Sequence, residues 1–145
     1  GINAYKSILA DLSKPLASVN QNPSKGNIHH SPLTIHHSFF DLIIADLPCT
    51  GSGTWGRTPE QLYFFEEKKI DEYSGLQKKI LSSVIPHLKK DGYLVYSTCS
   101  VFKKENEEVV KFLKQQFQLE VIRMELLKGY DRQADTLFTA LLRRS

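Results

Sequence analysis

Two short apolar runs, each followed at once by a cysteine among small polar residues, constrain the fold of this chain more than any other feature. The first run, residues 39–45, leads into Asp-Leu-Pro-Cys at 46–49, and the second, residues 93–98, leads into Cys99. Continuous apolar character over so few residues is typical of strands that are buried on both faces of a parallel sheet. We therefore expect two neighbouring parallel strands whose carboxyl ends carry the cysteines.

The remaining periodicity predicts an α/β domain. Apolar residues at helical spacing from Leu76 to Leu88 predict an amphipathic helix, with Pro86 in its last turn and Asp91-Gly92 as its end. A second helix is expected at 104–117, followed by a hairpin-like pair of strands at 119–126 and 136–143. Strands that alternate with helices favour a mostly parallel sheet, here with an antiparallel edge.

The first 38 residues differ in character from the rest. Residues 5–10 predict a short strand that ends at Asp11, and residues 17–38 predict a long loop without sustained periodicity. We divide the chain accordingly into 1–38 and a core at 39–145, which together form one partial domain. Because the chain begins without methionine, we expect it to be an excised piece of a longer protein.

Composition excludes several classes of protein. No run approaches the ~18 apolar residues that a membrane span needs. The formal net charge of +3 permits a nucleic-acid partner without requiring one. Two cysteines do not make a disulfide framework. The pairs His29-His30 and His36-His37 have no carboxylate or cysteine beside them at zinc-like spacing, so we expect solvated loop residues and no metal.

The positions of Cys49 and Cys99 favour a site rather than packing. In open α/β sheets, ligands and chemistry lie at the carboxyl ends of the strands, so neighbouring strands bring both thiols together. Free cysteines are often buried apolar fillers. That alternative does not explain why Asp-Leu-Pro-Cys and Thr-Cys follow two strands.

At these motifs the chain resembles a known family. Asp46-Leu47-Pro48-Cys49-Thr50-Gly51-Ser52-Gly53 is similar to motif IV, and Tyr96-Ser97-Thr98-Cys99-Ser100 to motif VI, of the RNA 5-methylcytosine methyltransferases of the RsmB (Sun, Fmu) family. The similarity extends from residue 39 to residue 143. It implies a Rossmann-like class I methyltransferase sheet of the doubly wound type, with S-adenosylmethionine as the methyl donor.

The resemblance also implies roles for individual residues. Carbon 5 of cytosine is a poor nucleophile until a thiolate adds to carbon 6, and Cys99 matches the family's nucleophile. Cys49 matches the cysteine that helps to release the methylated RNA. Asp46 matches an aspartate beside both the donor and the target base. Asp11 resembles the motif III residue that contacts the donor's adenine, although a turn aspartate at a strand end is the alternative reading.

RNA contacts are expected in the loop after the first apolar run. Arg57 is a candidate phosphate or base contact, and Trp55 a candidate for stacking on a splayed base. Tyr63, Phe64 and Phe65 have helical spacing, which favours core packing instead.

The parent reaction implied by the family is methylation of carbon 5 of a cytosine in RNA, with ribosomal RNA, and 16S rRNA in particular, as the expected partner in the cytoplasm. The glycine-rich loop that holds the donor is absent, because the similarity begins at about motif III. The sheet is therefore expected to be truncated and the fragment inactive by itself.

Adenine N-methylases are one rival, but they favour Asn/Asp-Pro-Pro-Tyr over the Pro48-Cys49 found here. A non-catalytic RNA-binding fragment or pseudoenzyme is the other.

Overall fold

The structure is a computed structural model that describes residues 40–145. The strand expected at 5–10, Asp11 and the long loop expected at 17–38 lie outside the described residues.

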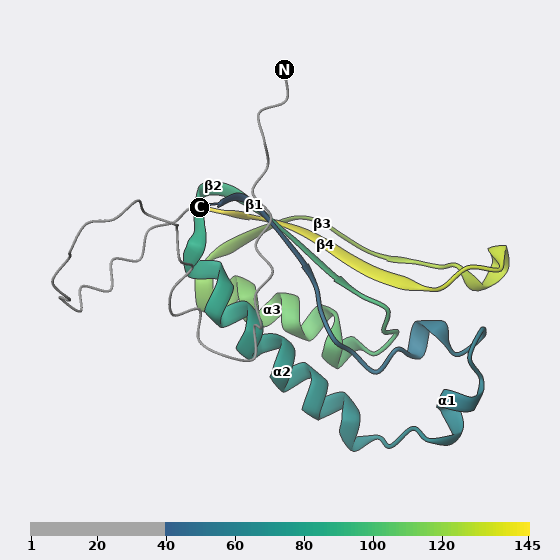
Figure 1. Cartoon of the computed structure of the whole chain (residues 1–145). Helices are drawn as coiled ribbons and strands as arrows, with labels where there is room; N and C mark the ends of the chain where they lie inside the picture. The colour runs from purple at the N-terminus through teal and green to yellow at the C-terminus, as the bar shows by residue number, and fades with distance from the viewer. Residues whose placement is uncertain (1–39) are drawn as a thin grey trace, which may run out of the picture.

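Four strands form one twisted sheet in the order β1-β2-β4-β3 (Figure 1). They are β1 (Phe40–Asp46), β2 (Leu88–Thr98), β3 (Leu119–Leu127) and β4 (Leu137–Arg144). β1 pairs with β2 in parallel, whereas β4 is antiparallel to both β2 and β3. The expected mixture of parallel and antiparallel strands is thus present.

The sequence led us to expect the antiparallel strand at the edge of the sheet. In the structure, β4 lies between β2 and β3 instead. The reason is burial. Phe138, Ala140 and Leu142 on one face of β4 are at most 1% exposed, whereas Leu119 is the one buried residue of β3. The more apolar strand of the hairpin takes the interior position, where it contacts strands on both sides.

Two long helices cover one face of the sheet, α2 (Lys68–Val84) and α3 (Glu107–Phe117) (Figure 1). Apolar residues of both helices pack against the inward side chains of β2 and β4 to form the core. The largest fully buried apolar side chains of this core are Tyr96, Phe138, Leu81, Ile85, Leu88, Leu94, Leu113, Leu119 and Leu142. Short helical turns complete the fold: α1 (Glu60–Tyr63), η1 (Ser52–Thr54), η2 (Ile85–His87), η3 (Lys103–Glu105) and η4 (Tyr130–Arg132).

The helix before β2 begins and ends earlier than its periodicity predicted. α2 ends at Val84, η2 carries Pro86, and Leu88 already begins β2. Proline lacks the N–H that a continuing helix needs, so the turn tightens at this point. Asp91, with φ of 62°, therefore lies inside the span of β2 rather than at a helix end.

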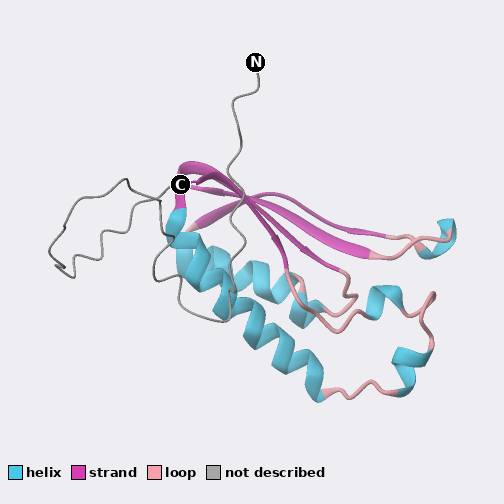
Figure 2. Cartoon of the chain, viewed as in Figure 1, coloured by secondary structure: helices cyan, strands magenta, loops and turns pink. Residues whose placement is uncertain are grey.

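The parallel pairing of β1 with β2 determines where the site lies. Ala45 is opposite Tyr96 and Asp46 is opposite Ser97, so both strands end at the same edge of the sheet. The loops that follow them are adjacent, as the pink segments beyond β1 and β2 show (Figure 2).

Candidate active site

Two loops at the carboxyl edge of the sheet build the site. The first, 47–53, follows β1, and the second, 99–102, follows β2. The Leu47 N–H donates to the Ser97 carbonyl at 3.1 Å, and the Gly53 N–H donates to the Cys99 carbonyl at 2.7 Å. The first loop is therefore bonded to the end of β2 and to the second loop.

The two loops bring both thiols into contact. Cys49 Sγ lies 3.3 Å from Cys99 Sγ, although the residues are 50 positions apart in the sequence. One thiol donates a hydrogen bond to the other, and both side chains are half-buried. The juxtaposition that the sequence predicted from two parallel strand ends is present.

The Cys49 thiol is held in its protonated form. Burial, as the largest cause, raises its pKa from 9.0 to about 12, and the neighbouring Cys99 thiol adds to the increase. A hydrogen bond with the Gly51 backbone acts in the opposite direction. Cys49 is therefore a thiol at neutral pH, able to donate its proton to the adjacent sulfur.

A buried carboxylate joins the two loops, and sequence reasoning did not assign it a role. Glu105 is 0% exposed. Its carboxylate accepts hydrogen bonds from the Thr50 N–H at 2.8 Å, the Thr50 hydroxyl at 2.7 Å and the Ser100 hydroxyl at 2.5 Å. The signal in the sequence was faint: Glu105 lies within the span of the family resemblance, but a glutamate next to Lys103 and Lys104 suggests a solvated turn.

Two amide side chains hold the same loops from the helix side. Asn106 accepts a hydrogen bond from the Thr98 hydroxyl at 2.6 Å and donates to the Ser100 carbonyl at 2.8 Å. Gln77 of α2 is fully buried and donates to the Pro48 carbonyl at 3.0 Å. The residue before Cys49 and the residue after Cys99 are thus each held by a buried amide side chain.

Asp46, the candidate for donor and base contacts, is the last residue of β1 and is exposed. It lies three residues before Cys49, at the edge where the two thiols meet. Asp11, the other candidate for the donor, lies outside the described residues.

Arg57, expected to contact RNA, has a partner within the chain. Its guanidinium donates two hydrogen bonds to the Asp135 carboxylate, at 3.1 and 2.7 Å, and its side chain is 69% exposed. This pair links the loop after β1 to the segment that precedes β4. The Arg57 side chain remains open to solvent on its free side.

The burial of the aromatic residues differs from what the sequence predicted. Trp55 packs edge-on against Phe65 and Phe102, with ring centroids 4.9 and 6.0 Å away. Tyr63 and Phe64 are 86% and 75% exposed, so the prediction that they pack in the core is wrong. α1 has only four residues and no buried ones, which leaves it without a core-facing side.

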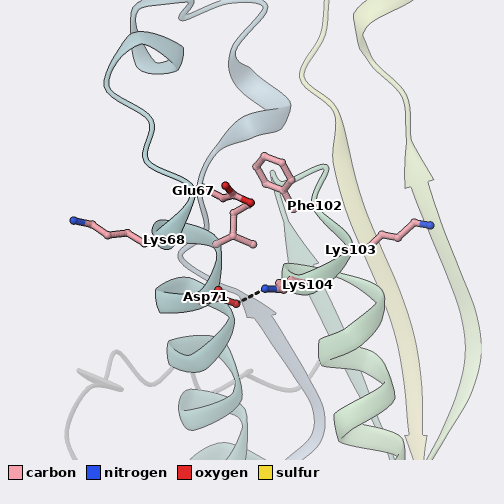
Figure 3. A pocket seen from close by; sticks show the side chains of 7 residues that line it. Glu67, Lys68, Asp71, Phe102, Lys103 and Lys104 are labelled. Carbon is pink, nitrogen blue, oxygen red and sulfur yellow. Dashed lines mark hydrogen bonds and ion pairs between the residues drawn. The ribbon is translucent and has the colours of Figure 1, made fainter.

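A hollow of about 390 Å³ lies where the start of α2 faces η3 (Figure 3). Its lining consists of Glu67, Lys68, Ile70, Asp71, Phe102, Lys103 and Lys104. Lys104 and Asp71 form an ion pair across it at 2.7 Å. The charges in this lining are mixed and neither cysteine belongs to it, so it is distinct from the thiol pair.

Comparison with known proteins identifies the family. A family model described as 16S rRNA methyltransferase RsmB/F matches residues 6–141. The chain belongs to the RsmB/F family of methyltransferases. Ribosomal RNA small subunit methyltransferase B of Enterobacter sp. (strain 638) is 43% identical over 76 residues, which make up 52% of this chain and 18% of that protein. Ribosomal RNA small subunit methyltransferase F of Psychromonas ingrahamii is 33% identical over 100 residues, 69% of this chain and 19% of that protein.

Solved structures, one of them named a methyltransferase homolog, share the α/β fold of this chain. PH0851 superposes with a TM-score of 0.71 at 31% identity, over 79% of this chain and 29% of that one. A methyltransferase homolog protein from Pyrococcus horikoshii gives 0.63 at 28% identity, over 74% and 40%. NSun6 from the same organism, in a structure with SFG, shares the fold with a TM-score of 0.62 at 24% identity, over 70% and 29%. The chain therefore spans about a fifth of the curated relatives cited above and between 29% and 40% of these solved chains.

Two features are absent from residues 40–145. No helix there is long and apolar enough to cross a membrane. No group of three or more His, Cys, Asp or Glu side chains in that range is placed to hold a metal ion.

Proposed function

We propose that this chain is the catalytic part of a longer enzyme that transfers a methyl group from S-adenosylmethionine to carbon 5 of a cytosine in ribosomal RNA, with 16S rRNA as the substrate. The observation that carries the proposal is the contact between Cys49 and Cys99, 3.3 Å apart, in a chain of the RsmB/F family. With ribosomal RNA as the substrate, we propose the cytoplasm as the place of action.

Cys99 is the proposed nucleophile. Its sulfur forms a bond to carbon 6 of cytosine, and the electron pair of the carbon 5–carbon 6 double bond makes carbon 5 enamine-like. S-adenosylmethionine would supply the methyl group that carbon 5 takes, leaving S-adenosylhomocysteine. Water then takes the carbon 5 proton, and the electron pair of that C–H bond re-forms the double bond and expels the Cys99 sulfur as a thiolate, which frees the methylated RNA.

Cys49 is proposed to act in the release step. Because its pKa is raised to about 12, it is protonated at neutral pH and lies within hydrogen-bond distance of Cys99 Sγ. It can donate to the sulfur as the carbon–sulfur bond breaks, which stabilises the departing thiolate. Without that donor the adduct persists.

The described residues meet the needs of the methyl donor only in part. Asp46 is exposed at the end of β1, three residues before Cys49, and its carboxylate can accept hydrogen bonds from the donor or from the exocyclic amine of cytosine. Asp46 does not line the hollow that the structure shows. The remaining donor contacts must come from residues beyond 40–145, with Asp11 as one candidate.

Arg57 and Trp55 are the proposed RNA contacts in this chain. The exposed Arg57 side chain, oriented by Asp135, can bind phosphate. Trp55 is half-buried by Phe65 and Phe102, so only part of its ring is open to a base. A pseudoenzyme that binds RNA without catalysis would use the same contacts, but it would not require two adjacent thiols.

Variants of the two cysteines in the complete enzyme test this proposal. Cys99→Ala should abolish both methylation and the covalent RNA complex, because no sulfur can add to carbon 6. Cys49→Ala should leave RNA covalently bound, because addition proceeds while release fails. Denaturing gel electrophoresis of labelled RNA separates the two outcomes. Normal turnover in Cys49→Ala together with trapped RNA in Cys99→Ala would exchange the roles, and turnover in both variants would refute the mechanism.

A further inference from the structure

Glu105 joins the residue after Cys49 to the residue after Cys99. Its carboxylate accepts two hydrogen bonds from Thr50, through the N–H at 2.8 Å and the hydroxyl at 2.7 Å. It accepts a third from the Ser100 hydroxyl at 2.5 Å. One buried side chain therefore contacts both cysteine loops at the positions next to the thiols.

We propose that Glu105 is a positioning residue that holds the Cys49 and Cys99 thiols against each other, an inference that rests on the function proposed above. The backbone of Glu105 is itself anchored. Its N–H donates to the Phe102 carbonyl at 3.1 Å, and its carbonyl accepts a hydrogen bond from the buried Tyr96 hydroxyl. The carboxylate thus reaches the loops from a fixed point.

The chemistry at this position calls for acceptors, because all three partners donate. Removing the Glu105 carboxylate leaves buried donors without partners, which is destabilising. The loops would still be joined by the contact between the Ser52 and Ser100 hydroxyls at 3.3 Å and by the bond from Gly53 to the Cys99 carbonyl. We therefore expect Glu105→Ala to alter the spacing of the thiols rather than to unfold the chain.

Glutamine at position 105 keeps the shape of glutamate, so it serves as the control for the loss of the side chain in Glu105→Ala. Its amide oxygen can accept from the Thr50 N–H, and its NH₂ group can donate to the Thr50 and Ser100 hydroxyl oxygens, since hydroxyl protons rotate. Glu105→Gln should therefore keep the loops in place, whereas Glu105→Ala should not.

The test uses phenylarsine oxide, which condenses with two neighbouring thiols, forming two arsenic–sulfur bonds and releasing one water. Because the chain has only two cysteines, the reagent reports on this pair alone. Binding is followed by the intact mass of the 145-residue chain during titration. We expect Glu105→Ala to weaken the apparent affinity about tenfold or more, and Glu105→Gln to stay within about threefold of the unsubstituted chain.

Leu113→Ala is the matched control, because Leu113 is a fully buried core residue of α3 outside the two loops. It lowers stability without touching the thiols, so its affinity for the arsenical should be unchanged. The proposal is overturned if Glu105→Ala binds as tightly as the unsubstituted chain, or if Leu113→Ala loses as much affinity. Should Glu105→Ala not fold, Thr50→Val removes one hydroxyl donor at constant shape; weakened binding then supports the proposal and unchanged binding overturns it.

The readout also separates this inference from the proposed function. It measures the spacing of the thiols and needs neither RNA nor methyl donor. If Cys99 fails to form an RNA adduct while the Glu105 variants behave as expected, the methyltransferase mechanism is wrong and the positioning role stands. If the adduct forms while Glu105→Ala keeps full arsenical affinity, the positioning role alone is wrong.

Discussion

At the scale of single residues, the candidate site consists of two half-buried thiols in contact. Burial keeps Cys49 protonated, with a pKa of about 12, while Cys99 lies one hydrogen bond away. A sulfur that must leave is best placed beside a group that still carries its proton. This arrangement suits the separate tasks that we propose for the two cysteines, which the sequence motifs suggested only through family resemblance.

The raised pKa of Cys49 predicts how it reacts with iodoacetamide, which is attacked by thiolates and releases iodide. At pH 9 an unfolded chain, with the ordinary thiol pKa of 9.0, has half of this residue ionised. The folded chain should react at Cys49 more slowly, by about a hundredfold or more, because a pKa raised from 9.0 to about 12 leaves almost none of the thiol ionised at pH 9. Peptide mapping by mass spectrometry after timed alkylation, with and without urea, measures both rates.

The dependence on pH distinguishes ionisation from simple shielding of Cys49. In urea the rate should level off above about pH 10, whereas in the folded chain it should keep rising towards pH 12, as the remaining thiol ionises. Equal rates at pH 9, or a folded-state rate that is flat with pH, would contradict the protonated state that we assign to Cys49.

At the scale of elements, the site is made by a parallel strand–helix–strand unit whose two strand ends are then bonded together. Gly53 is where this bonding is tightest. Its N–H donates to the Cys99 carbonyl at 2.7 Å, and its carbonyl accepts from the Thr136 N–H at 3.0 Å. The loop after β1 is thereby placed between the loop after β2 and the residue before β4.

Gly53→Ala should disrupt this junction. A Cβ at position 53 would lie 2.1 Å from the Thr136 carbonyl oxygen and 2.8 Å from the Cys99 carbonyl oxygen, and backbone atoms cannot move aside easily. We expect a loss of about 1–3 kcal/mol in the free energy of unfolding, measured by urea titration. Gly56→Ala, in the same loop with nothing within 4 Å of its added Cβ, is the control and should change it by less than about 0.5 kcal/mol. Equal losses of unfolding free energy in the two variants would contradict the close backbone approach at Gly53.

Much of this element-level picture follows from the sequence. Apolar runs of strand length predicted β1 and most of β2, and helical spacing predicted α2 and α3, because those patterns reflect burial on one or two faces. The position of β4 was not predictable in the same way. Neighbours in sequence predict a hairpin, but which strand of the hairpin joins β2 depends on how each packs over α3.

The candidate site also has features that the sequence predicted and features that it did not. The meeting of Cys49 and Cys99 was predictable, since parallel strands end at one edge of a sheet. Glu105 was not, because buried glutamates are uncommon and its partners lie on two loops distant in sequence. The ion pair between Arg57 and Asp135 was also unforeseen, since the residues are 78 positions apart.

At the scale of the whole molecule, the described part shows one covered and one open face of the sheet. α2 and α3 lie on one side (Figure 1), while Leu42, Ile44 and Tyr93 on β1 and β2 are 51%, 69% and 42% exposed. An apolar sheet face of this kind is normally covered by a further layer of the domain. The chain spans about a fifth of its curated relatives, which have the length for such a layer.

This incompleteness predicts weak binding of S-adenosylmethionine by the 145-residue chain. We expect Asp46, with Asp11 as a second candidate, to supply few of the hydrogen bonds that hold the donor. Each missing bond to a charged or buried group is worth ~1.5–3 kcal/mol. Because ~1.4 kcal/mol is tenfold in affinity, we expect binding at least about a hundredfold weaker than in the complete enzyme, and no methyl transfer. Titration calorimetry decides this, and micromolar binding by the chain alone would show that its donor pocket is more complete than we infer.

The central claim, that Cys99 attacks carbon 6 of a cytosine in RNA, is tested most directly by trapping the adduct. The complete enzyme is incubated with S-adenosylmethionine and ribosomal RNA that contains 5-fluorocytosine. Fluorine at carbon 5 cannot leave as a proton does, so the adduct should persist after methyl transfer. Nuclease and protease digestion followed by mass spectrometry should then find a methylated fluorocytidine attached to the peptide that contains Cys99. No adduct, or an adduct on the Cys49 peptide instead, would contradict the account.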